Sequence, residues 1–121
     1  MTRRLYPVEI AGGSEGEALL CASRRDVPLV SVMLECPGGQ SCSPADVPGL
    51  AELSAALLGE GAEEFTPLEW HRRLDLDALG MHASAAPLAW RAELDCLSSD
   101  LDRALGLFQE WLTRPALPAG E

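Results

Sequence analysis

Residues 47–61 constrain the fold most, because they form the strongest helical stretch in the chain. The alanines in this stretch favour a helix, and the larger apolar residues recur at helical spacing to form one stripe: Val47, Leu50, Leu53, Leu57 and Leu58. Asp46 is expected to cap the helix, with Pro48 in the first turn. Gly59 or Gly61 would end it in a left-handed conformation. The apolar stripe is therefore expected to be buried.

Alternating polarity predicts an antiparallel sheet. In residues 28–36 and again in residues 90–96, apolar side chains alternate with polar or charged ones, so each strand is expected to bury one face and expose the other. Shorter strands are expected at residues 5–10, 18–22 and 81–86. Gly and Pro residues separate these segments, as turns between strands require.

A second helix has a clear start signal. Thr66 is its expected N-cap and Glu69 its third helical residue, which together make a capping box. Phe65 and Trp70 stand at the positions of a hydrophobic staple. The helix is expected to run to about residue 79, with Gly80 as its stop.

A last helix follows the second alternating strand. Ser98 or Ser99 is expected to cap it, and Arg114-Pro115 to end it. Its apolar residues recur at helical spacing: Leu101, Leu105, Phe108 and Leu112. The order of elements predicts an α+β fold, in which an antiparallel sheet carries helices on one face.

Length and charge limit the number of domains and the partners. With 121 residues the chain is expected to form a single domain over residues 1–121, complete or incomplete. A net charge of -10 argues against nucleic acid and against anionic membrane surfaces as partners. No apolar targeting segment follows Met1 and no run reaches membrane-spanning length, so a cytoplasmic location is expected.

The four cysteines lack the spacing of a metal site. Cys21, Cys36 and Cys96 lie in apolar or alternating stretches and are expected to be buried free thiols in a reducing compartment. Cys42 lies in an expected loop. His71 and His82 likewise have no acidic or cysteine ligand at convincing spacing, so neither is expected to bind a metal or act in catalysis.

The phrase GLAxLxxxLLxEG, at residues 49–61, resembles the first long helix of the insulinase/pitrilysin family of inverted-zincin metallopeptidases. In active members this helix carries HxxEH, whose histidines bind zinc and whose glutamate activates the metal-bound water. Aligned on Gly49, the first histidine position holds Glu52, the glutamate position Ala55 and the second histidine position Ala56. Two of the three groups are methyls, so the resemblance implies no catalytic and no metal-binding residue.

Further segments resemble the same family in the same order. Residues 28–34 are similar to its PxVSVxL strand, Pro37-Gly38-Gly39 to its glycine turn, residues 79–84 to its turn into a strand, and residues 105–118 to its ending. The likeness covers nearly the whole chain, which corresponds to the first part of one family domain. The glutamate that completes the zinc site in active members would lie beyond Glu121.

By this resemblance the chain is a non-catalytic domain, or a fragment of one, that serves a zinc-dependent peptidase as a structural and substrate-contacting partner. A homologous HxxEH-bearing subunit is the expected partner, peptides are the substrate class, and zinc is expected only in that subunit. The alternative is a free-standing interaction module that self-associates and has no link to proteolysis. The isolated chain is expected to dimerise or aggregate, because an incomplete sheet leaves an unpaired edge.

Overall fold

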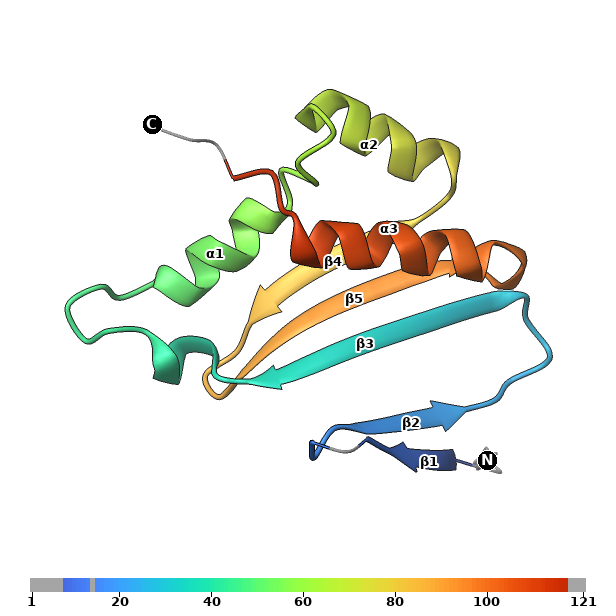
Figure 1. Ribbon diagram of the computed structural model, residues 1–121, viewed down its shortest axis with the longest axis horizontal. Coiled ribbons are helices and arrows are strands. Elements are labelled where there is room, and N and C mark those ends of the chain that lie inside the picture. The colour runs from blue at the N-terminus through green and yellow to red at the C-terminus, as the bar shows by residue number, and fades with distance from the viewer. Residues whose placement is uncertain (1–7, 14, 118–121) are drawn as a thin grey trace, which may run out of the picture.

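The computed structural model describes residues 8–13 and 15–117, and its centre is a three-stranded antiparallel sheet (Figure 1). The strands are β3 (Leu29–Pro37), β4 (Gly80–Ala85) and β5 (Ala89–Leu97), in the order β3-β5-β4. Val32 lies opposite Leu94, and Met81 lies opposite Leu94 on its other side. All three strands were expected, β3 and β5 from alternating polarity and β4 as a short strand at residues 81–86, and the α+β fold class is confirmed.

Three helices lie on one face of this sheet (Figure 1). They are α1 (Leu50–Leu58), α2 (Pro67–Leu76) and α3 (Leu101–Thr113), and the two short 3-10 turns η1 (Gly39–Cys42) and η2 (Ser98–Asp100) precede α1 and α3. The outer face of the sheet carries polar contacts between β3 and β5: Ser31 Oγ donates to Asp95, and Arg91 Nε lies 2.6 Å from Glu35 Oε2. None of the helices in the described part of the chain is long and apolar enough to cross a membrane.

The core lies between the helices and the inner face of β5. Its largest fully buried side chains are Trp70, Trp111, Leu94 and Cys96. Trp111 comes from α3, and its indole Nε1 donates a hydrogen bond of 2.6 Å to the carbonyl oxygen of Leu58 at the end of α1. This bond satisfies the one polar atom of a side chain that is otherwise packed among apolar groups.

The first two strands form a ribbon of their own rather than part of the main sheet. β1 (Val8–Gly12) pairs with β2 (Ala18–Ala22) and lies on the β3 side of the molecule (Figure 1). The expected strand at residues 5–10 begins outside the described residues. Ile10, Leu19 and Leu20 of the ribbon are all exposed. The expectation of one sheet is corrected here, because no strand in the described part of the chain pairs with the free edge of β3.

The start of α2 is as expected from the sequence. Glu69 N donates a hydrogen bond of 3.3 Å to Thr66 Oγ1, and Thr66 N donates one of 2.9 Å to Glu69 Oε2. Both halves of the capping box are therefore present. The ring centroids of Phe65 and Trp70 lie 5.7 Å apart, so the two side chains make the contact of a hydrophobic staple. The end was placed too late, because α2 stops at Leu76 and Ala78, not Gly80, takes the left-handed conformation with φ 50°.

Replacing Thr66 with alanine is expected to lower the free energy of unfolding by about 0.5–2 kcal/mol, because it removes the side-chain acceptor of the box. The backbone N–H of Thr66, its hydroxyl and the charge of Arg72 also lower the pKa of Glu69. A lowered carboxyl pKa stabilises the fold above the ordinary Glu pKa, and that contribution is lost as the pH falls through the lowered value. Urea unfolding across acid pH measures this loss. An NMR titration of Glu69 in Thr66→Ala should show a higher pKa than in the wild type.

The other two helices begin differently from expectation. Asp46 does not cap α1: the helix begins at Leu50, and its N-cap is Gly49 in a left-handed conformation with φ 85°. Gly61 rather than Gly59 has positive φ beyond its end. Neither Ser98 nor Ser99 caps α3. Both residues lie in η2, and the N-cap of α3 is Asp100. The end of α3 at Thr113 agrees with the expected stop at Arg114-Pro115.

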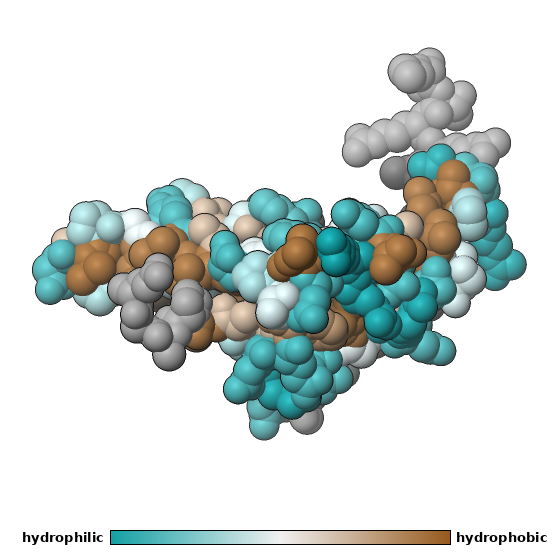
Figure 2. Space-filling view, turned by 90° about the horizontal axis from the view of Figure 1, so that it is seen from above, coloured by the Kyte–Doolittle hydropathy of each residue, from teal (hydrophilic) through white to brown (hydrophobic). Residues whose placement is uncertain are grey.

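The apolar stripe of residues 47–61 is only partly buried within the described residues, which corrects the clearest expectation about α1. Leu53 is 58% exposed, and Val47 and Leu50 are also exposed. The small residue Ala55 faces the interior instead. Figure 2 shows hydrophobic surface at the end of the molecule that α1 forms. α1 therefore turns Ala55 inwards and packs Leu58 against the core, but it leaves Leu50 and Leu53 exposed in the described structure.

Candidate functional site

The helix that resembles the zinc-binding helix of the peptidases is held at one end of the sheet. α1 contacts β4 and η1, and Ser54 Oγ donates a 2.7 Å bond back to the carbonyl oxygen of Leu50. The preceding turn is fixed by Gln40 N and Ser41 N, which donate to Ala86 O and Pro87 O of the β4–β5 hairpin. The motif positions thus lie on a helix that packs on β4 and follows a turn fixed to the β4–β5 hairpin.

The three motif positions differ in their surroundings. Ala55 is 5% exposed and faces the sheet, whereas Glu52 and Ala56 are exposed. Gln40 Nε2 donates a hydrogen bond to Glu52 Oε1. Methyl groups at Ala55 and Ala56 can neither ligate a metal nor move a proton. Among the described residues no group of three His, Cys, Asp or Glu side chains lies close enough together to hold a metal ion.

Neither histidine lies on α1, and the two histidines lie on different elements. His71 lies exposed on α2, and His82 lies exposed on β4 opposite Glu93 of β5. Met81, the neighbour of His82, packs towards the core, so His82 belongs to the outer face of the sheet.

The expectation that Cys21, Cys36 and Cys96 are all buried is wrong for two of them. All four are free thiols, but Cys21 and Cys36 are exposed, as is Cys42, and only Cys96 is buried as expected. Burial, reinforced by the nearby charges of Asp100 and Asp95, raises the pKa of the Cys96 thiol. Because the thiolate is the reactive form, Cys96 is a packing residue at neutral pH.

Introducing the missing glutamate is expected to destabilise the fold. In Ala55→Glu a carboxylate would be forced against the sheet, and the free energy of unfolding should fall by about 1–3 kcal/mol. Ala56→Glu is the matched control, since the same side chain on the exposed side of the same turn should change stability by less than about 0.5 kcal/mol. Urea denaturation of both variants measures the difference. Equal losses in the two variants would contradict the burial of Ala55 towards the sheet.

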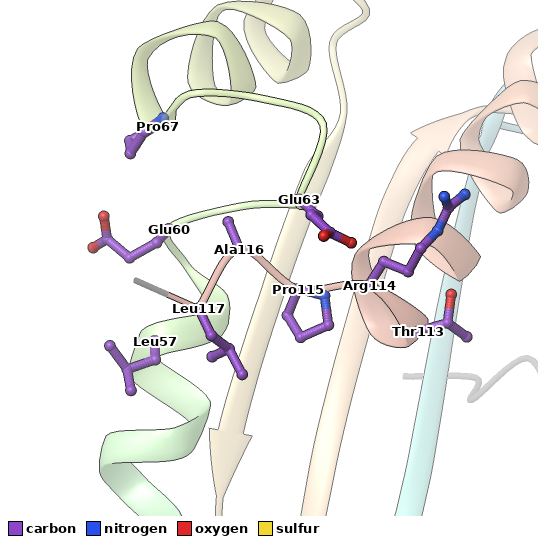
Figure 3. A pocket seen from close by; sticks show the side chains of 9 residues that line it. All are labelled: Leu57, Glu60, Glu63, Pro67, Thr113, Arg114, Pro115, Ala116 and Leu117. Atoms are coloured by element: carbon purple, nitrogen blue, oxygen red, sulfur yellow. The ribbon is translucent and has the colours of Figure 1, made fainter. Parts of the chain in front are cut away.

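A groove with a volume of about 890 Å³ opens where α1 ends. Its apolar lining consists of Leu57, Pro67, Pro115, Ala116 and Leu117, and its polar lining of Glu60, Glu63, Thr113 and Arg114 (Figure 3). These residues come from the end of α1, the loop between α1 and α2, the start of α2, and the end of α3 with the segment that follows it. The groove contacts the motif-bearing helix at its C-terminal end, through Leu57.

A short backbone bridge builds this groove. Glu63 N donates a hydrogen bond of 2.8 Å to Arg114 O, and Ala116 N donates one of 2.8 Å to Gly61 O. The segment after α3 therefore lies against the segment after α1. The sequence did not predict the groove, because its two halves, in residues 57–67 and 113–117, lie far apart in the chain. The local sign of the groove in the sequence was the set of apolar residues around Arg114, namely Leu112, Pro115, Ala116 and Leu117.

Comparison with solved structures defines the kind of domain. A crystal structure of the inactive domain of a peptidase M16 from Pseudomonas fluorescens is 27% identical to this chain, covers 93% of it and gives a TM-score of 0.81. A protease from Helicobacter pylori is 16% identical, covers 95% of the chain and gives a TM-score of 0.77, a likeness of fold. The chain spans 27% and 28% of the lengths of these two proteins.

No protein-family model matches the sequence, and a search of curated proteins finds no match. The structural comparison nevertheless confirms the resemblance expected from residues 49–61: the chain is similar to a non-catalytic, insulinase-type M16 domain. Its length corresponds to part of such a protein.

Proposed function

We propose that this chain is a non-catalytic peptidase-like domain, or part of one, that supports a zinc-dependent peptidase as a structural and substrate-contacting partner. The observation that carries the proposal is the likeness to an M16 inactive domain, at 27% identity over 93% of the chain. The methyl groups at Ala55 and Ala56 agree with it, because neither can supply zinc chemistry. Residues 1–121 would then belong to a single α+β domain without catalytic residues of its own.

The expected partner is a homologous subunit that carries HxxEH and its own zinc. The exposed leucines of α1 and the exposed apolar ribbon of β1 and β2 support a partner, since apolar surface of this kind is costly to leave in water. The four free thiols support a reducing compartment, so we place this assembly in the cytoplasm.

Capture from its own cells tests this proposal. Native mass spectrometry of the captured protein reads both the mass of the chain and anything bound to it. A homologous HxxEH-bearing chain in the complex, or the appearance of this sequence within a longer polypeptide that includes one, is the expected result. A 12.9 kDa chain alone or bound only to itself would overturn it.

Self-association without any link to proteolysis is the second candidate function. The free edge of β3 favours it, because an unpaired edge strand offers backbone donors and acceptors to another strand. Sedimentation velocity of the purified chain distinguishes the candidates. A stable dimer together with no captured peptidase would favour this second function.

A further inference from the structure

The groove at the end of α1 combines an apolar lining with unpaired negative charge. Its one cation, Arg114, is already engaged: Nη1 lies 3.4 Å from Glu64 Oε1, and Nη2 lies 3.8 Å from Glu110 Oε1. The carboxylates of Glu60 and Glu63 make no ion pair with any of the described residues. The groove therefore presents net negative charge next to apolar side chains.

We propose that this groove binds a peptide that carries a basic side chain beside an apolar one. The basic group would pair with Glu60 or Glu63, and the apolar side chain would pack on Leu57 and Leu117, which lie near one another at one end of the groove (Figure 3). Leu117 is 61% exposed, so its burial by a ligand would be favourable. A volume of about 890 Å³ accommodates several side chains rather than one small ion.

Charge argues for such a peptide over the other occupants. A second copy on a two-fold axis would bring the same carboxylates towards each other, and like charges repel. An anionic membrane surface would be repelled in the same way. The net charge of -10 would also draw a cationic ligand from solution. This inference rests on the proposed function in that it names the class of peptide such a domain would contact.

Fluorescence anisotropy with a defined probe tests it. The probe is a fluorescein-labelled peptide with two leucines and two arginines, and its neutral counterpart carries citrulline in place of each arginine. The wild-type chain should bind the arginine peptide and bind the citrulline peptide at least about threefold more weakly. Glu60→Gln/Glu63→Gln should weaken binding of the arginine peptide by about three- to tenfold.

A variant with the same change in net charge controls for nonspecific attraction. Glu15→Gln/Glu17→Gln lies in the exposed turn between β1 and β2 and should leave the affinity unchanged. Equal weakening by both double variants, or equal binding of the two peptides, would overturn the proposal. So would a dimer in sedimentation velocity that Leu117→Glu dissociates, because the groove would then be an interface between copies. The assay uses the purified chain and probe, so its result is independent of whether a peptidase is captured from cells.

Discussion

Replacing Trp111 with alanine should lower the free energy of unfolding by about 3–5 kcal/mol. The side chain is 1% exposed and lies in the core cluster with Phe108, whose ring centroid is 5.7 Å away. Truncation removes a large apolar area, leaves a cavity, and deletes the 2.6 Å hydrogen bond to Leu58 O that links α3 to α1. Urea denaturation followed by circular dichroism measures the loss.

Two further substitutions separate the causes of this effect. Trp111→Phe keeps most of the apolar ring but has no N–H, so it should cost about 1–2 kcal/mol. Leu105→Ala changes an exposed residue of the same helix and should cost less than about 1 kcal/mol. If Leu105→Ala were as damaging as Trp111→Ala, Trp111 would not be a central contact between α3 and the rest of the core.

Replacing Gly39 with alanine should destabilise the chain by about 2–4 kcal/mol. Gly39 has φ 66°, and a Cβ atom there would lie 2.1 Å from Ala86 O and 2.6 Å from Ala89 O. Both atoms belong to the backbone of the β4–β5 hairpin, and they cannot move aside as a flexible side chain would. The clash would also disturb the turn that leads into α1, because Gln40 N donates to the same Ala86 carbonyl oxygen.

Gly106→Ala is the control with the opposite expected sign. Gly106 lies within α3, and a Cβ atom there would meet nothing within 4 Å. Because alanine is a better helix former, this variant should gain about 0.5–1 kcal/mol. Thermal and urea unfolding of the two variants side by side measure both effects. A Gly39→Ala chain that is as stable as the wild type would show that the turn does not approach the hairpin this closely.

The patterns confined to a few neighbouring residues were predicted well from the sequence. The capping box at Thr66 and Glu69 depends on hydrogen bonds within one helical turn, and the structure contains both of them. The alternation in β5 also identified its buried side, and in β3 it identified the half-buried Val30 and Val32, because successive side chains of a strand point to opposite faces. The absence of catalytic and metal-binding roles at Glu52, Ala55 and Ala56 stays a prediction from the sequence.

Burial was predicted less well, because it depends on what lies across from a segment in space. The stripe of α1 has the spacing of a buried face, yet Leu53 is exposed and Ala55 faces the sheet. Cys21 and Cys36 lie in apolar strands, yet no described element covers them. Apolar spacing states which residues share a face, but it does not state whether another element packs on that face.

The sequence by itself determined the order of strands and helices, the start of α2, the α+β class and the methyl side chains at Ala55 and Ala56. Each of these depends on residue types at fixed short spacing. Only the tertiary structure decided that β1 and β2 form a separate ribbon and that a groove joins the end of α1 to the segment after α3. The physical reason is that the bonds between Glu63 and Arg114 and between Ala116 and Gly61 connect segments far apart in the chain, and no local pattern specifies such pairs.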